Sequence, residues 1–183
     1  MNFILPAAGA LILVVILLLV YYFLVRDSRL LVKKFRVIKI IGPNDTKPAN
    51  DNESGWRTFQ IAEIKAYSDN KVLTPADFSS IVYGKEPGYD IVNYPATNAY
   101  DNNINTFSHT GGLGNEHTLE FTLKTPQIIS KVELSNRQDC CPERLSNSKL
   151  EFIDENNNVV GRFSIFATKK PQVFLWSGYN NTK

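Results

Sequence analysis

The uncharged run from Phe3 to Val25 constrains this chain more than any other feature, because leucine, isoleucine, valine and alanine dominate it. A helix rises about 1.5 Å per residue, so a run of roughly 23 residues is long enough to cross a bilayer core of about 30 Å. Aromatic residues from Tyr21 to Phe23 stand where such a helix would meet the membrane interface. The sequence therefore predicts one transmembrane α-helix in residues 1–25.

A cleaved signal peptide is the alternative for this run. Such a peptide has a basic start, a short apolar centre and small residues at its cleavage site. This run has no basic residue before it, and it ends in the bulky sequence from Tyr21 to Val25. We therefore expect the run to remain as a membrane anchor.

Basic residues follow the apolar run and predict its orientation. The juxtamembrane segment 26–34 contains Arg26, Arg29, Lys33 and Lys34 against a single acidic residue. Because basic flanks stay on the cytoplasmic side, we expect a single-pass membrane protein whose domain faces the cytosol. The same charges would contact anionic headgroups of the bilayer, or act only as a stop-transfer signal. Three glycosylation triplets would fit the opposite orientation, but such short triplets occur by chance. They start at Asn44, Asn52 and Asn180.

The remaining residues, 35–183, suffice for one domain, and their short alternating runs predict strands. The predicted strands are Phe35–Ile41, Thr58–Tyr67, Thr118–Leu123, Lys131–Leu134, Lys149–Ile153, Val159–Phe166 and Gln172–Trp176. In the second of these we expect Phe59, Ile61 and Tyr67 to share one side of the strand. The fold class is therefore predicted to be all-β, an antiparallel jelly-roll β-sandwich.

The connections between these strands are rich in turn residues. Asp154 to Asn158 predicts a hairpin loop, because aspartate and asparagine tolerate positive φ. Only the stretch from Pro75 to Ser80 indicates a helical turn.

Charge and motifs exclude two classes of function. The formal net charge of +2 argues against a nucleic-acid-binding protein. The chain lacks a phosphate-binding glycine loop, a nucleophile elbow and a zinc-protease motif. We therefore expect no enzymatic activity and no nucleic-acid partner.

The segment from Arg137 to Arg144 places two guanidinium groups, one carboxylate and two adjacent cysteines directly after a strand. Arginine offers up to five donors in a fixed fork, and Asp139 accepts, so the pattern suits a hydroxyl-rich ligand. In the alternative interpretation, the arginines form structural ion pairs with Asp139 and Glu143 and only brace the loop.

The segment from Asn136 to Leu145 resembles the signature of the F-type, fucose-binding lectins, which are discoidin-like, or galactose-binding-like, β-sandwiches. Arg137, Asp139 and Arg144 fit the family pattern. His109 is the matching histidine, although it lies one residue further from Arg137 than is usual. The resemblance implies that the histidine and both arginines bind sugar hydroxyls. In the alternative interpretation, His109 is an ordinary surface residue that binds no ligand.

The same resemblance implies that a disulfide between Cys140 and Cys141 packs on the sugar. If the protein is a lectin, we expect an aromatic ring such as Tyr100 or Phe107 to pack on the apolar face of the sugar as well. In the cytosol the two cysteines would instead stay reduced. The sequence leaves both states open.

Two further features depend on this resemblance. The run from Phe59 to Tyr67 is similar to the C-terminal strand of the family, which implies a permuted fold. The loop from Asn98 to Asn103 is similar to the family's structural calcium loop. The implied ligands of Ca²⁺ are Asn98, Asp101, Asn103 and Glu63. Asx-turns explain the same loop without a metal, and Glu63 would then pair with a lysine.

Two functions follow from these features. The first is a minor capsid protein of a large DNA virus; the chain resembles such proteins in its anchor and its asparagine-rich sequence. In this function the anchor holds the internal membrane of the virion, and the sandwich binds neighbouring shell proteins. The second is a membrane-tethered lectin for fucose-type glycans.

Overall fold

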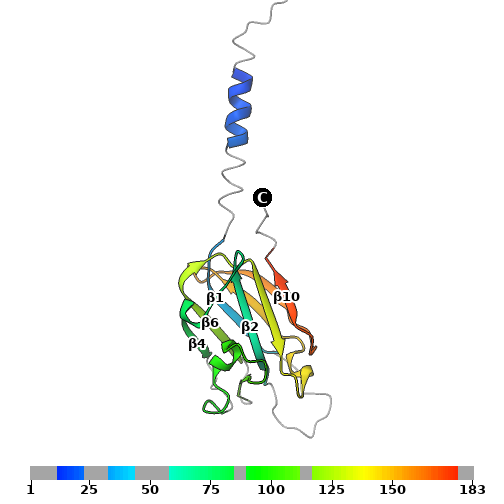
Figure 1. The fold of residues 1–183 in the computed structure, drawn as a ribbon. Coiled ribbons are helices and arrows are strands. Elements are labelled where there is room, and N and C mark those ends of the chain that lie inside the picture. The colour runs from blue at the N-terminus through cyan, green and yellow to red at the C-terminus, as the bar shows by residue number, and fades with distance from the viewer. Residues whose placement is uncertain (1–11, 23–32, 44–57, 85–89, 112–116, 177–183) are drawn as a thin grey trace, which may run out of the picture. The chain divides into compact units, whose positions relative to one another are not determined.

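The computed structural model describes residues 12–22, 33–43, 58–84, 90–111 and 117–176. The chain divides into two units, Met1–Lys33 and Lys34–Lys183. In the first, residues 12–22 form a helix (Figure 1). No helix among the described residues is long and apolar enough to cross a membrane. The rest of the predicted span, most of the basic segment and all three glycosylation triplets lie outside the described residues.

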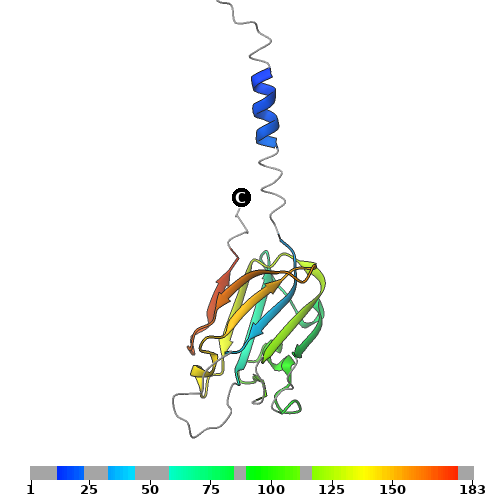
Figure 2. The same cartoon turned by 180° about the vertical axis from the view of Figure 1, so that it is seen from behind.

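The second unit consists of two antiparallel sheets packed face to face, as Figures 1 and 2 show from opposite sides. The first sheet contains, in spatial order, β4 (Phe78–Tyr83), β6 (Thr118–Gln127), β1 (Phe35–Ile41), β8 (Lys149–Ile153) and β9 (Val159–Ser164). The second contains β10 (Gln172–Leu175), β7 (Lys131–Asn136), β2 (Gln60–Ser68) and β3 (Lys71–Val72), and β5 (Ser108–His109) also pairs with β2. The predicted antiparallel all-β sandwich is confirmed for the described residues.

Short 3₁₀ turns connect these strands. They are η1 (Pro75–Asp77), η2 (Ala96–Tyr100) and η3 (Pro142–Leu145). The predicted helical turn corresponds to η1, where Asp77 accepts hydrogen bonds from the amide and hydroxyl groups of Thr74. The predicted hairpin loop joins β8 to β9, and the Asp154 carboxylate accepts the amide hydrogens of Asn156 and Asn158.

Alternating side chains of both sheets meet in a closed apolar core. Leu119, Phe121 and Leu123 of β6 are fully buried. Val132 and Leu134 of β7 are equally buried in the opposite sheet. Complete removal of such side chains from water stabilises a fold by about 1.5 to 3 kcal/mol each, so this layer fixes the sandwich.

A β-bulge interrupts the alternation of β2. Its pairing with β7 shifts register between Ile61 and Glu63, so one extra residue is inserted there. Beyond the bulge Ile64 faces the core, whereas Tyr67 lies on the outer face and donates its hydroxyl hydrogen to Glu133. The prediction that Tyr67 lies on the same side of the strand as Phe59 is therefore wrong.

Turn η2 closes the gap between the two sheets. The Tyr100 ring contacts Phe78 of β4 and Phe121 of β6, with centroids 4.8 and 5.9 Å away. Its hydroxyl donates to the Leu73 carbonyl and accepts the Ala66 amide hydrogen. Tyr100 is thus a buried core residue, and the expectation that its ring packs on a ligand is wrong.

The ends of the domain lie together. Figures 1 and 2 place the start of β1 and the end of β10 at the same end of the sandwich. There the Trp176 ring contacts Phe35 at a centroid distance of 5.1 Å. Neighbouring ends make a permuted strand order easy to accommodate. The permutation itself stays a prediction.

Candidate functional site

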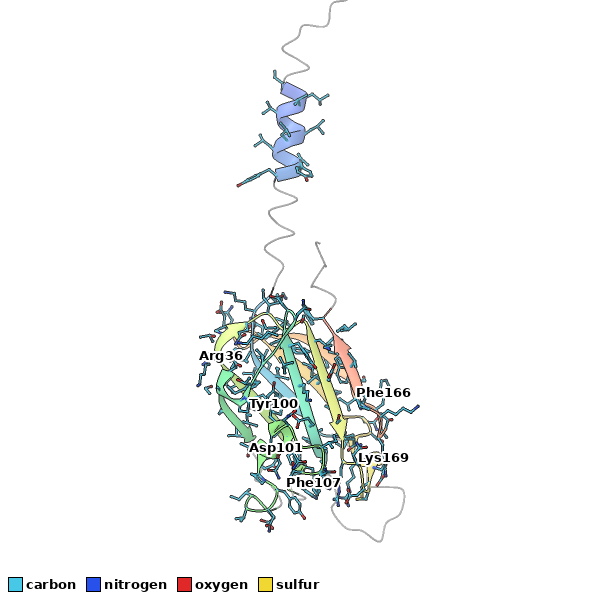
Figure 3. All side chains as sticks on the ribbon, in the orientation of Figure 1. Arg36, Tyr100, Asp101, Phe107, Phe166 and Lys169 are labelled. Carbon is cyan, nitrogen blue, oxygen red and sulfur yellow. A yellow bond between two sulfur atoms is a disulfide. The ribbon has the colours of Figure 1, made fainter. Side chains whose placement is uncertain are left out.

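The predicted ligand-binding residues lie on β5 and on the segment that follows β7, and both of these strands pair with β2 at one end of the second sheet. His109 of β5 lies directly opposite Gln60 of β2, and Asn136, the last residue of β7, lies opposite Ile61. Arg137 follows Asn136, so it leaves the sheet next to the His109 pairing. Figure 3 shows Phe107 at this end of the domain and Arg36 at the other.

Arg137 is held by a carboxylate and an aromatic ring. Its Nε and Nη2 donate to the two carboxylate oxygens of Asp139 at 2.5 and 2.8 Å. Its guanidinium carbon lies 4.1 Å from the centre of the Phe107 ring. The hydrogen bonds from Arg137 lower the pKa of Asp139 to about 2, although the Asp139 side chain is two-thirds exposed. The structural ion pair considered for Arg137 therefore exists, and it also fixes the direction of the guanidinium group.

His109 is buried rather than a surface residue, with 5% of its area exposed. The pKa of its imidazole is lowered, first by burial and then by the charges of Arg144 and Arg137. The neutral ring is therefore favoured. Its Nδ1 lies 2.7 Å from the carbonyl oxygen of Thr110 and donates to it, which places the acceptor lone pair on Nε2.

Tyr94 and Tyr83 complete this cluster. Tyr94 stacks on Phe107 at a centroid distance of 4.7 Å and approaches the His109 ring at 5.8 Å. The Tyr83 hydroxyl accepts the backbone hydrogen of His109 at 2.8 Å and donates to the Tyr94 carbonyl at 2.5 Å. Burial raises the pKa of Tyr83 to about 12, so the hydroxyl keeps this hydrogen. Sequence reasoning missed both tyrosines, because neither stands near the arginine motif in the chain.

The cysteine pair forms the turn after Arg137. Cys140 and Cys141 are joined by a disulfide, and Cys141 has the left-handed φ of 60°. The structure thus differs from the reduced pair expected in the cytosol. The Asn136 side chain donates to the Pro142 carbonyl at 3.1 Å and so ties this turn to the end of β7. Arg144 follows in η3, and its charge acts on His109.

These contacts give the cluster defined chemical abilities. His109 supplies an acceptor, Arg137 and Arg144 supply donors, and the stacked rings of Tyr94 and Phe107 supply an apolar face. Hydroxyl groups beside an apolar surface are what a sugar ring offers to such a site. The structure brings the predicted ligand-binding residues into one cluster; their part in binding stays a prediction.

A depression of about 830 Å³ lies elsewhere, over the outer face of the first sheet. Three of the charged residues that line it are already paired. Arg162 binds Glu151, with Nη2 2.5 Å from the carboxylate, and Lys39 binds Glu120 at 2.9 Å. This depression therefore does not mark the site of the predicted residues.

Three of the four predicted calcium ligands converge beside the same sheet. The amide hydrogen of Asn103 is shared between Glu63, at 3.1 Å, and Asp101, at 2.9 Å. Burial, and then the charge of Asp101, raise the pKa of Glu63 to about 7. Among the described contacts Glu63 has no ion pair with a lysine. Two carboxylates held this close would accommodate a hard cation such as Ca²⁺.

Asx-turns account for the rest of this loop. Asp101 accepts a hydrogen bond from the Thr106 hydroxyl at 2.6 Å, and the Asn103 side chain accepts the Asn105 amide hydrogen at 3.1 Å. The side-chain nitrogen of Asn98 donates to the Phe107 carbonyl at 3.2 Å, so it braces the aromatic segment. Within the described residues no group of three or more histidine, cysteine, aspartate or glutamate side chains forms a metal site. Any Ca²⁺ would therefore depend on carbonyl and amide oxygens as well.

The comparisons with known proteins agree with this architecture. Residues 98–174, from η2 to β10, match the family model described as NedA-like, galactose-binding domain. This match includes His109 and the arginine motif but neither β1 nor β2. No curated protein and no solved structure matches the chain. The described β-sandwich is therefore similar to galactose-binding-like domains over less than half of the chain.

Proposed function

We propose that this protein is a non-enzymatic lectin that binds a fucose-type or galactose-type sugar residue at the His109–Arg137–Arg144 cluster. One observation supports this above all: a neutral, buried imidazole lies beside two guanidinium groups and a stacked aromatic pair. In this site Nε2 of His109 accepts from one hydroxyl, while the guanidinium groups donate to others. The rings of Tyr94 and Phe107 pack against the apolar face of the sugar.

The apolar run from Phe3 to Val25 supports attachment of this lectin to a membrane as a single-pass anchor. Burial of its leucine, isoleucine and valine side chains in lipid would hold the protein. The anchored domain would then bind glycans on neighbouring molecules.

The side of the membrane on which the domain lies distinguishes the lectin from the second function, that of a minor capsid protein. The basic flank favours the cytosolic side, as a minor capsid protein linking a viral shell to an internal membrane requires. The disulfide between Cys140 and Cys141 favours an oxidising compartment, as a lectin for surface glycans requires. Protease protection of the tagged, membrane-inserted chain decides between them. A protected, glycosylated domain excludes the shell-linking function in the cytosol.

A glycan array tests the binding function. Full-length protein in mild detergent is applied to the array beside the Arg137→Ala and Arg144→Ala variants. Arg36→Ala is the matched control, because Arg36 lies at the other end of the domain and binds only the Lys124 carbonyl among the described contacts. We expect wild type and the control to bind the same fucose- or galactose-containing glycans and both site variants to lose them. Equal signals from all four proteins would rule the proposal out.

A bound Ca²⁺ would stabilise the loop that supports this site. The loop that holds Asp101 and Asn103 continues directly into the segment of Phe107. Neutralising the repulsion between the Glu63 and Asp101 carboxylates would stabilise that loop. The hydrogen bond from Asn98 to the Phe107 carbonyl would extend this stabilisation to the segment that carries the Phe107 ring. Calorimetric titration with CaCl₂ measures this binding directly. A Glu63→Gln variant that binds Ca²⁺ as well as wild type does would contradict it.

A further inference from the structure

Gln60 of β2 is completely buried, and its side-chain amide has no hydrogen-bond partner in the described part of the chain. This holds for both Oε1 and Nε2. A glutamine amide offers two donors and two acceptor positions, and leaving them unsatisfied away from water is costly. Since folded proteins satisfy nearly all such groups, this exception requires a reason.

The register of the sheet places Gln60 beneath the candidate sugar site. Residues directly opposite each other in an antiparallel pair project from the same face, so the side chains of Gln60 and His109 share one face of the second sheet. On the other edge of β2, Ile61 is opposite Asn136, and continuing that register by one residue brings Arg137 next to Gln60. Gln60 therefore stands between the two residues proposed to bind sugar hydroxyls.

A second polar group on the same strand supports this interpretation. Thr58 precedes Gln60 by two residues and so projects to the same side, where its buried hydroxyl also lacks a partner among the described residues. Two neighbouring buried polar groups without partners indicate a polar surface on this side of β2 that a ligand could satisfy, rather than a single imperfectly packed residue. The face they occupy is the one that carries His109.

We infer that Gln60 is a further sugar-binding residue, whose amide pairs with a ligand hydroxyl that enters between His109 and Arg137. This inference rests on the proposed lectin function and extends it. A sugar hydroxyl donates and accepts at once, so it suits an amide that offers both, whereas the arginines only donate. Full burial of Gln60 requires a neighbouring side chain to move on binding. In the register of the sheet Arg137 is the neighbour of Gln60, and its partner Asp139 is largely exposed, so the two side chains can move together as a pair.

The test replaces the amide without changing the size of the side chain. Full-length Gln60→Met and Gln60→Leu variants are titrated calorimetrically with L-fucose and D-galactose, and their thermal unfolding is recorded without sugar. Ser148→Ala is the control, because the buried Ser148 hydroxyl also lacks a partner but precedes β8 in the other sheet. We expect both Gln60 variants to lose at least tenfold in affinity while their unfolding midpoints stay at or above that of wild type. The control should keep wild-type affinity.

Two results would overturn the inference. Affinity within twofold of wild type would show that the amide does not touch the sugar. Midpoints well below wild type for both variants would show that the amide already has a partner in the free protein. If wild type binds neither sugar, the lectin function fails, and this inference fails with it. If wild type binds, Arg137→Ala does not, and both Gln60 variants do, only the role of Gln60 is refuted.

Discussion

Glu63 gives this domain a distinctive dependence of stability on pH. Its folded-state pKa of about 7 lies above the ordinary value of 4.5, because burial and Asp101 both disfavour the charged carboxylate. The folded protein therefore holds this proton more tightly than the unfolded chain does. In calcium-free buffer, stability from this group is fully present below pH 4.5 and is lost as pH rises to about 7.

The size of this effect follows from the two pKa values. Each pH unit between about 7 and 4.5 corresponds to about 1.4 kcal/mol, so the free energy of unfolding should fall by about 3 kcal/mol across this window. The Glu63→Gln variant keeps an acceptor for the Asn103 amide but has no titrating proton, so it should lack this slope.

Urea unfolding at several pH values between 4 and 8, with a chelator present, measures the difference between wild type and Glu63→Gln. Subtraction of the two curves removes the contribution of every other titrating group. An Asp101→Asn variant serves as the intermediate case, because removing that charge lowers the pKa of Glu63 and narrows the window. A difference curve that is flat, or that rises with pH, would refute the reasoning. Saturating Ca²⁺, if it binds, should abolish the fall by keeping the carboxylate ionised.

Three other substitutions test the structure. Replacing Cys140 and Cys141 by serine should change the free energy of unfolding by only about 1 kcal/mol, because the disulfide joins adjacent residues and closes a minimal ring. The same replacement should weaken sugar binding at least tenfold. Urea denaturation measures the first effect and calorimetry the second. Tyr83→Phe should cost about 1 to 3 kcal/mol in urea unfolding, because it leaves one buried amide hydrogen and one carbonyl unpaired. Gly161→Ala should cost a similar amount, since the added methyl group overlaps the Trp176 indole; a variant as stable as wild type would contradict that packing.

Strong local patterns predicted the larger strands. The bounds of β1 and β8 equal the predicted runs, because β-branched and aromatic residues stand between clear turn residues. The strands that were not predicted lie at edges or are very short, as in β3, β4 and β5. Their stability comes from pairing with a longer neighbour, which a local pattern does not record.

The candidate site was predictable only where it is local in the chain. Arg137 and Asp139 stand two residues apart, so their pairing follows from the motif alone. Tyr83, Tyr94 and Gln60 enter through tertiary contacts and register, and nothing in their sequence neighbourhoods distinguishes them. Tyr100 was misassigned for the same reason, since its place in the core depends on how η2 closes the sandwich.

The bulge in β2 has a consequence for the direction of this strand. On one side of the inserted residue the strand pairs Gln60 with His109, and on the other its Glu63 accepts the Asn103 amide hydrogen. Losing that single residue would leave Glu63 outward and Ile64 in the core, because the pairs on either side of it already alternate, but it would remove the local bend that a bulge gives to a strand. We therefore expect the inserted residue to set the direction in which the end of β2 that pairs with His109 leaves the sheet, and not to decide which side chains of the strand face the core.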